Sequence, residues 1–171
     1  INGYLQLNGN KYPAQAIHRI DYETSGLVLF CKHPFFQAYC DKNMEEHHIK
    51  KDYIALVQGQ TNYKNKKIVS NIARDRHNAK KMIIHPNGKE SISIFNTLKN
   101  YKDYSLIQVT ILTGRKHQIR VQCASLKHPI LNDSLYGGKR IDNTGLLLQS
   151  HHIQFNDIDV ICPQEKRFIR K

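Results

Sequence analysis

The first candidate for a catalytic residue in this sequence is an acidic residue in a basic stretch. Residues 18–30 read HRIDYETSGLVLF, in which Asp21 follows Arg19 by two positions and precedes Glu23 by two. A carboxylate beside an arginine stays ionised at neutral pH, which favours a nucleophile or general base over a general acid. Two alternatives remain open: a surface ion pair in a turn, and a glycosidase carboxylate pair, which this close spacing supports only weakly.

A second group of reactive side chains lies at residues 113–120, which read TGRKHQIR. Three basic residues at 115–117 precede a predicted helix, whose first backbone N–H groups could help them hold a phosphate. Arg120 is adjacent to Ile119 on the apolar stripe of that helix, so it is expected to be partly buried and to need a carboxylate partner. A solvated basic helix start is equally compatible with the pattern.

Other candidate side chains give weaker signals. Tyr53 lies on an alternating stretch, KDYIALVQG, where it either packs in the core or forms a stacking platform for a base. The histidine pairs at 47–48 and 151–152 consist of neighbours that point apart, and no zinc-type spacing is present, so we expect no metal. The four cysteines form no C-x-x-C pair, which is typical of free thiols in a reducing compartment, and we expect a cytoplasmic location.

Charge is the most informative property of the composition. The 171 residues carry 26 Lys and Arg against 14 Asp and Glu, a net charge of +12. Such an excess favours a polyanion such as RNA as partner over a protein that is merely basic. The chain shows no apolar run of about 20 residues and no glycine-rich nucleotide motif, so we expect no membrane span and no nucleotide cofactor.

The hydrophobic pattern predicts a single α+β domain over residues 1–171. We expect a mixed, mostly antiparallel sheet with flanking helices, because several predicted strands follow one another directly. Predicted strands cover residues 26–33, 51–59, 91–100, 104–114 and 145–155. Helices are predicted for 34–47 and 117–128, a structural turn for 132–138, and a basic hairpin or loop insertion for 58–81.

Read together, four stretches resemble, in order, the motifs of RluA-type RNA pseudouridine synthases. They are HRIDYETSGLVLF, KKDYIALVQG, TGRKHQIRVQCASLKHPILNDSLYGG and LLLQSHHIQF, and the resemblance extends over about residues 17–155. It implies the pseudouridine synthase catalytic-domain fold and the isomerisation of uridine to pseudouridine in structured RNA, either rRNA or tRNA. It also implies that no metal and no cofactor take part.

The resemblance assigns roles to individual residues. Asp21 matches the catalytic aspartate, Tyr53 the tyrosine that packs on the target base, and Arg120 the arginine that pairs with the aspartate. Arg19 matches an arginine beside the flipped nucleotide, and Arg115 a basic residue facing the RNA. From its place in the basic cluster, His117 joins them as a substrate-binding candidate.

The sequence also departs from the family pattern. The first residues, INGYLQLNGNKYPAQA, lack the KP-x-G stretch usual in the family, so we expect the domain to lack its N-terminal strand and an S4-type domain upstream. Gln149 replaces a histidine often found in the last motif. One rival reading is a non-catalytic RNA-binding module, which predicts loss of Asp21 or Arg120; another is a glycoside hydrolase, which predicts a second acid near Asp21 and no basic excess. We expect a monomeric enzyme.

Overall fold

One large sheet organises the chain. The computed structural model describes residues 1–169, and within them eight strands form this sheet. In hydrogen-bonded order, seven of them are β10 (Ile158–Ile161), β9 (Leu148–Phe155), β4 (Lys50–Gln58), β8 (Tyr104–Ile111), β7 (Lys89–Asn100), β5 (Lys66–Arg74) and β6 (Met82–Ile84). All these pairs are antiparallel, whereas β2 (Ser25–Gly26) lies parallel to β9.

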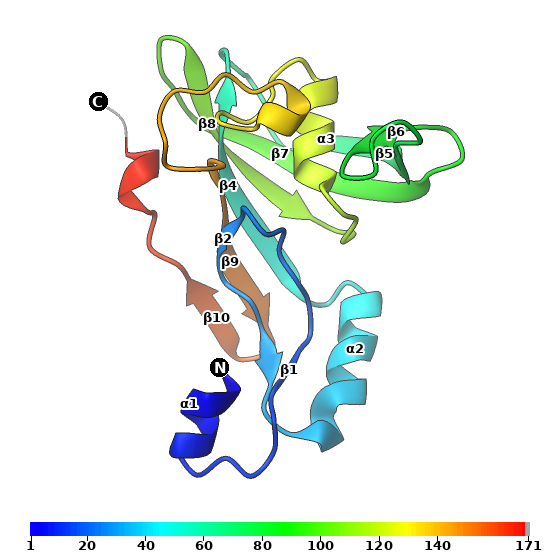
Figure 1. Cartoon of the computed structure of the whole chain (residues 1–171), viewed down its shortest axis with the longest axis vertical. Coiled ribbons are helices and arrows are strands. Elements are labelled where there is room, and N and C mark those ends of the chain that lie inside the picture. The colour runs from blue at the N-terminus through cyan, green and yellow to red at the C-terminus, as the bar shows by residue number, and fades with distance from the viewer. Residues whose placement is uncertain (170–171) are drawn as a thin grey trace.

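The helices and a small second sheet lie around this framework. The α-helices are α1 (Asn2–Leu7), α2 (Gln37–Glu45) and α3 (Gln118–Ser125), and β1 (Gln15–Ala16) pairs with β3 (Phe30–Cys31). Short 3₁₀ turns span Pro34–Phe36, Ser134–Tyr136 and Lys166–Phe168. In Figure 1 the paired strands β4 and β9 run from the part of the molecule that carries α3 to the part that carries α2, β1 and α1.

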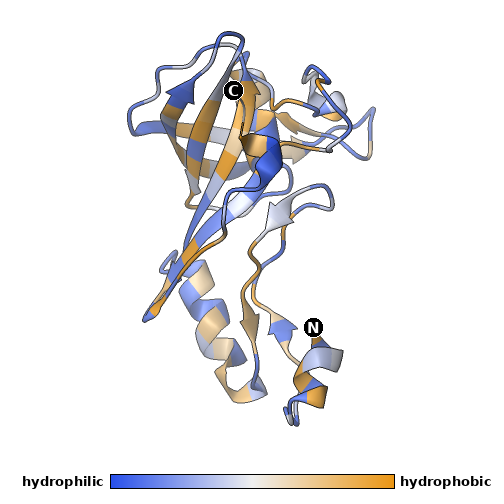
Figure 2. Cartoon of the chain, turned by 90° about the vertical axis from the view of Figure 1, so that its left-hand side faces the viewer, coloured by the Kyte–Doolittle hydropathy of each residue, from blue (hydrophilic) through white to orange (hydrophobic). Residues whose placement is uncertain are grey.

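Three hydrophobic clusters follow from this arrangement within the described residues, the smallest of which joins Ile72 of β5, Val121 of α3 and Tyr136. The main core surrounds the middle of β4, whose residues are buried on both faces, and includes Ile119 and Cys123 of α3. A second, smaller core holds α2 against the far ends of β3 and β9; its buried members are Cys31, Cys40, Ile49, Ile153 and Phe155. Figure 2 shows the hydrophobic residues concentrated along the central strands, while the loops at their ends are mostly hydrophilic.

Most of the predicted elements are confirmed. The class is α+β with a mostly antiparallel sheet, and β4, the β7–β8 pair, α2, α3 and β9 occupy the predicted segments. In α3 the predicted stripe of Ile119, Cys123 and Leu126 packs on the main core. The turn at 132–138 is also as predicted: Gly137 has a φ of +83°, and a Cβ on Gly138 would lie 1.8 Å from the Ile130 carbonyl oxygen.

The predicted continuous strand at 26–33 is wrong. Only Ser25–Gly26 and Phe30–Cys31 are extended in ladders, and they belong to different sheets. The cause lies at Gly26, whose φ is +105° and whose Cα lies against the backbone of Ser150. A residue in this conformation ends the parallel pairing with β9, and the chain then turns toward β1.

The prediction for residues 58–81 was right only in part. A hairpin is present, formed by β5 and β6, but β5 is no appendage because it pairs with β7 inside the large sheet. Its ladder begins with two exposed lysines, Lys66 and Lys67, and only Ile72 is fully buried. These polar positions hid the two-residue period by which a strand is recognised.

A cluster of charged side chains joins three strands of the sheet. His152 on β9 lies with Nδ1 2.9 Å from the Asp52 carboxylate of β4 and with Nε2 2.8 Å from the Asp159 carboxylate of β10. Both ring nitrogens face acceptors, so the ring satisfies both only when it is protonated. The hydrogen bond with Asp52 raises the pKa of His152, although burial opposes the shift.

We predict that this cluster makes stability depend on pH. The pKa of His152 is raised on folding. Its contribution to the free energy of unfolding is therefore complete below the ordinary imidazole pKa of about 6.5, and it is lost as pH rises through the higher pKa of the folded state. Melting temperatures of the wild type should therefore decline from about pH 6.5 upward, and His152→Gln should flatten the decline. Parallel curves for the two proteins would show that the cluster contributes nothing.

Asp52 determines how the stability of the cluster changes on the acidic side of the pH range. Burial alone raises the pKa of this carboxyl, but hydrogen bonds from His152 and Thr110 and the charge of Lys50 lower it overall. Its contribution is therefore present above the ordinary aspartate pKa and is lost as pH falls through the lower folded value. The cluster is most stabilising between the two limits.

Candidate active site

Asp21 lies in a tight turn that is fastened to the large sheet. The Thr24 amide donates to the Asp21 carbonyl oxygen at 2.9 Å, which closes the turn. Immediately afterwards β2 pairs with β9, and the Leu27 amide donates to the Ser150 carbonyl oxygen at 3.0 Å. The half-buried Asp21 side chain thus lies on a loop whose following residues are hydrogen-bonded to the large sheet.

A cavity of about 340 Å³ opens beside Asp21. Its polar wall includes the Asp21, Arg19, Arg115 and Arg120 side chains, and its apolar wall comes from residues of β4, β8, β9 and α3. The full lining is Arg19, Ile20, Asp21, Thr24, Tyr53, Ile111, Gly114, Arg115, Lys116, Gln118, Ile119, Arg120 and Leu148. A cavity that combines an apolar wall with convergent polar groups suits a small-molecule or base-sized ligand.

Tyr53 forms part of the cavity wall from the middle of β4. Its side chain is 6% exposed, so it also packs in the main core. Burial raises the pKa of Tyr53 to about 12, and the nearby negative charge of Asp21 adds to the shift. The hydroxyl is therefore protonated at neutral pH. Both roles considered for this tyrosine, core packing and a wall that a base can contact, are compatible with its position.

Arg120 has a different main partner from the one expected. Its Nε and Nη2 donate to the two carboxylate oxygens of Asp133 at 2.8 and 2.7 Å, and Nη2 lies 3.1 Å from the Glu23 carboxylate. Among residues 1–169, no hydrogen bond or ion pair joins Arg120 to Asp21. The structure therefore shows Asp133, and not Asp21, as the direct partner of Arg120. Asp133 is fully buried directly behind the guanidinium and satisfies its planar donors in pairs.

The electrostatics of Arg120 still connect it with Asp21. Burial on its own lowers the pKa of the Arg120 guanidinium, but the hydrogen bonds and charge of Asp133 raise it above its ordinary value. Glu23 and Asp21 add smaller effects in the same direction. Arg120 is thus a permanent positive charge at the back of the cavity, 3% exposed, within electrostatic range of the Asp21 carboxylate.

The three other predicted residues lie around the mouth of the site. Arg19 and Arg115 are exposed and line the cavity, and Arg115 Nε donates to the Glu90 carbonyl oxygen at 3.0 Å. His117 is not among the cavity-lining residues: its Nδ1 lies 2.8 Å from the Tyr136 hydroxyl, beside α3. Burial lowers the pKa of His117, so the ring is neutral at pH 7. Its role toward a substrate stays a prediction.

Two further residues of the site were not predicted. Asp133 was interpreted as part of a structural turn, yet it is the sole acidic residue between positions 104 and 141, and that isolation was the available signal for a partner of Arg120. Thr24 lines the cavity with a buried hydroxyl that has no hydrogen-bond partner within residues 1–169. The hydroxyl is therefore available to a ligand, and nothing in the sequence distinguished it from any other turn threonine.

The described part of the chain contains no cluster of three or more His, Cys, Asp or Glu side chains that could hold a metal ion. None of its helices is both long enough and apolar enough to cross a membrane.

Comparison with known proteins decides the family. Residues 2–125 match the family model described as RNA pseudouridylate synthase. The chain belongs to this family. The RluA-type resemblance is confirmed as well, since curated relatives of this pseudouridine synthase domain include large-subunit pseudouridine synthases C and D.

The most informative relatives are bacterial. An uncharacterised RNA pseudouridine synthase of Bacillus subtilis is 38% identical over 94% of this chain and 52% of its own length. The ribosomal large subunit pseudouridine synthase D of Borreliella burgdorferi is 34% identical over 96% of the chain and 51% of its own length. This pseudouridine synthase domain therefore spans about half the length of these relatives.

Solved structures confirm the fold of the pseudouridine synthase domain. Human RNA pseudouridylate synthase domain containing 1 superimposes with a TM-score of 0.81 at 24% identity, covering 93% of this chain and 72% of its own. The human domain containing 4 gives a TM-score of 0.78 at 18% identity, covering 95% and 76%.

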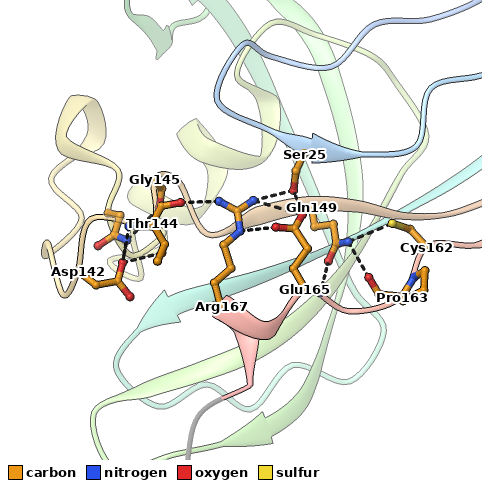
Figure 3. A network of polar contacts seen from close by, with 10 residues as sticks. Ser25, Asp142, Thr144, Gly145, Gln149, Cys162, Pro163, Glu165 and Arg167 are labelled. Atoms are coloured by element: carbon orange, nitrogen blue, oxygen red, sulfur yellow. Dashed lines mark hydrogen bonds and ion pairs between the residues drawn. The ribbon is translucent and has the colours of Figure 1, made fainter. Parts of the chain in front are cut away.

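The C-terminal residues of the pseudouridine synthase domain reach back to the loop of Asp21. Figure 3 shows Arg167 between Thr144, Glu165 and Ser25: its guanidinium donates to the Thr144 carbonyl oxygen at 2.8 Å and to Ser25 Oγ at 2.6 Å, and pairs with Glu165 at 2.8 Å. Ser25 Oγ in turn donates to Glu165. We call residues 162–168 the C-terminal strap; it holds Ser25, four residues after Asp21.

Gln149, the residue that departs from the family pattern, fastens the same strap. Its side chain is fully buried, and Nε2 donates to Pro163 O at 3.0 Å and to Cys162 Sγ at 3.2 Å. Phe168, at the end of the strap, is fully buried in the main core. The amide at position 149 thus has a structural role in this chain.

We predict that the Arg120–Asp133 pair is essential for stability and the Arg120–Glu23 pair is not. Asp133→Asn leaves a buried guanidinium without its counter-charge, and should lower the free energy of unfolding by about 3–5 kcal/mol. Glu23 is half exposed, so the control variant Glu23→Gln should cost about 0–1 kcal/mol. Urea denaturation monitored by circular dichroism compares the two. Equal losses would contradict this assignment.

Proposed function

We propose that the domain isomerises uridine to pseudouridine in structured RNA, with Asp21 as the reacting carboxylate. The observation that carries the proposal is the convergence of Asp21, Tyr53 and Arg120 on one cavity of about 340 Å³ in a chain of this family. Arg19 and Arg115 at the mouth and a net charge of +12 suit the binding of RNA phosphates.

The proposed reaction rearranges the bonds of one nucleotide. The N1–C1′ bond breaks, the uracil turns, a C5–C1′ bond forms, and the proton released from C5 is balanced by one that N1 takes up. An ionised Asp21 either attacks C1′ or removes a proton from C2′ to give a glycal, and we leave both routes open. The target uridine must first leave the helical stack to reach the cavity.

The surrounding residues have defined tasks in this proposal. Arg120, fixed by Asp133, supplies a permanent positive charge within electrostatic range of the Asp21 carboxylate. Tyr53 contacts the face of the extruded base and offsets part of the cost of unstacking. Arg19 and Arg115 hold the backbone on either side of the base.

Large-subunit ribosomal RNA is the substrate that we favour, and tRNA is the alternative. Support comes from the relatives in Borreliella burgdorferi and Buchnera aphidicola, whose names assign them to the ribosomal large subunit at 34% and 38% identity. We propose a monomeric cytoplasmic enzyme that acts without a cofactor. Incubating purified protein with ribosomal RNA and with tRNA, followed by chemical mapping of pseudouridine, tests activity and substrate together. Conversion of neither RNA would refute the proposal.

Asp21→Asn is the decisive variant. It keeps the size of the side chain but removes the charge, and an amide is neither a nucleophile nor a base here, so pseudouridine formation should fall below detection. RNA affinity should be retained or slightly increased, because a negative charge near the phosphates is gone. The matched control is Glu23→Gln, which removes a neighbouring charge and should stay active. Wild-type turnover by Asp21→Asn would exclude the proposed role of Asp21.

Two variants of Tyr53 distinguish the stacking of its ring from a chemical role of its hydroxyl. Tyr53→Phe keeps the aromatic face and should lower turnover more than RNA affinity, whereas Tyr53→Ala should lower both. The lost stacking is worth about 1–3 kcal/mol per base. Single-turnover rates and RNA dissociation constants give the two readouts, and melting temperatures control for the loss of core packing. If Tyr53→Phe matches the wild-type rate, the hydroxyl has no chemical role.

A further inference from the structure

A second cavity, of about 550 Å³, lies next to the first. The two share five wall residues, Arg19, Tyr53, Ile111, Gly114 and Arg115. On the side away from Asp21, the second cavity is lined by the C-terminal part of α2 and by residues 17 and 18. The second cavity is therefore within reach of an RNA strand whose base enters the first.

The first unusual wall residue is Lys51. It precedes Tyr53 by two positions on β4, so both side chains lie on the same face of the strand. Lys51 is 5% exposed, and its Nζ has only the thioether of Met44, at 2.9 Å, as hydrogen-bond acceptor within residues 1–169. Burial lowers the pKa of Lys51, and no carboxylate counteracts the shift. A buried ammonium with so weak a partner is costly.

The second unusual wall residue is His18. Its Nε2 lies 3.1 Å from the Leu29 amide and accepts that hydrogen bond, so the ring hydrogen is on Nδ1. Burial, and then the charge of Lys51, lower the pKa of His18 to about 4, so the ring is neutral at pH 7. The backbone at Arg19 acts in the opposite direction and raises the pKa, but the buried Nδ1 makes no well-formed hydrogen bond within the described chain. It is a donor with at most a weak backbone acceptor.

Two neighbouring buried donors without a proper acceptor, in the wall of one cavity, define the chemistry of the missing group. The group must offer at least two acceptor oxygens and carry negative charge, because a water molecule satisfies hydrogen bonds but leaves the ammonium uncompensated. Arg19 and Arg115 add positive charge on the shared wall, whereas Glu45 and Glu90 are exposed carboxylates on the rim. Those carboxylates disfavour a multiply charged anion more than a singly charged one.

We propose that Lys51 and the Nδ1–H of His18 form a binding site for one phosphodiester of the RNA strand, next to the uridine that enters the Asp21 cavity. The site rests on the proposed function for the identity of the strand. A phosphodiester fits because it has two free oxygens and a single charge, and because the shared wall places the site next to the cavity proposed for the flipped nucleotide.

The test measures how RNA binding depends on salt. Lys51→Met keeps the length of the side chain and removes its charge, and it should weaken binding of a uridine-containing RNA hairpin roughly tenfold at low salt. The slope of log affinity against log salt should fall by about 0.7. Lys102→Met, an exposed lysine in the turn between β7 and β8, is the matched control and should leave the slope unchanged. An unchanged slope in Lys51→Met overturns the proposal.

Stability distinguishes a ligand site from a structural role. If the Lys51 ammonium has its counter-charge only in a bound anion, the unliganded Lys51→Met variant should melt at the wild-type temperature or above it, since a costly buried charge is removed. A lower melting temperature with an unchanged slope would make Lys51 structural and overturn the site. Lys51→Arg keeps the charge and should retain the salt slope, which provides a second variant if Lys51→Met fails to fold.

Inorganic phosphate separates the two sources of the anion. If inorganic phosphate raises the melting temperature of wild type but not of Lys51→Met, while the RNA salt slopes of the two are equal, the site takes a free anion and the phosphodiester proposal fails. If the slopes differ but wild type converts no uridine in any RNA, the phosphate site stands and the proposed activity fails. The two proposals can therefore be refuted separately.

Discussion

The buried ion pair between Arg120 and Asp133 is the interaction on which the site depends. It joins α3 to the turn at 132–138, and the third contact of the guanidinium reaches Glu23, two residues beyond Asp21. Taking two ions out of water is costly, and the two parallel hydrogen bonds between them offset part of that cost. A single side chain thereby fixes the back of the cavity and links α3 to the turn at 132–138, while its contact with the half-exposed Glu23 adds little.

The large sheet supplies the other fixed reference for the site. β4 is buried on both faces and pairs with β8 and β9, so Tyr53 has little freedom to move. The Asp21 turn is attached to the same sheet through β2, because β2 pairs with β9. Asp21 and Tyr53 come from different parts of the chain but are attached to the same sheet, as is expected where reactive groups must be held in a set geometry.

Local patterns in the sequence predicted what depends on neighbours along the chain. The alternation of β4 and the stripe of Ile119, Cys123 and Leu126 gave the right elements, and the family motifs placed Asp21, Tyr53 and Arg120 on one cavity. Pairings between distant segments were not predictable in this way. Asp133 as partner of Arg120 depends on how a turn folds over a helix, the interruption of residues 26–33 depends on contact of Gly26 with Ser150, and the place of β5 in the sheet depends on β7.

The C-terminal strap gives the domain an order of assembly. Asp21 is made before the strap, but the side chains that hold Ser25 behind it belong to Glu165 and Arg167, and the strap is anchored by Phe168 in the main core. A ribosome must therefore release almost the whole domain before these contacts with the reactive turn can form. A chain whose synthesis has not reached the strap contains the Asp21 motif but lacks the contacts of Glu165 and Arg167 with Ser25. The final geometry of the reactive turn therefore forms only when the domain is complete.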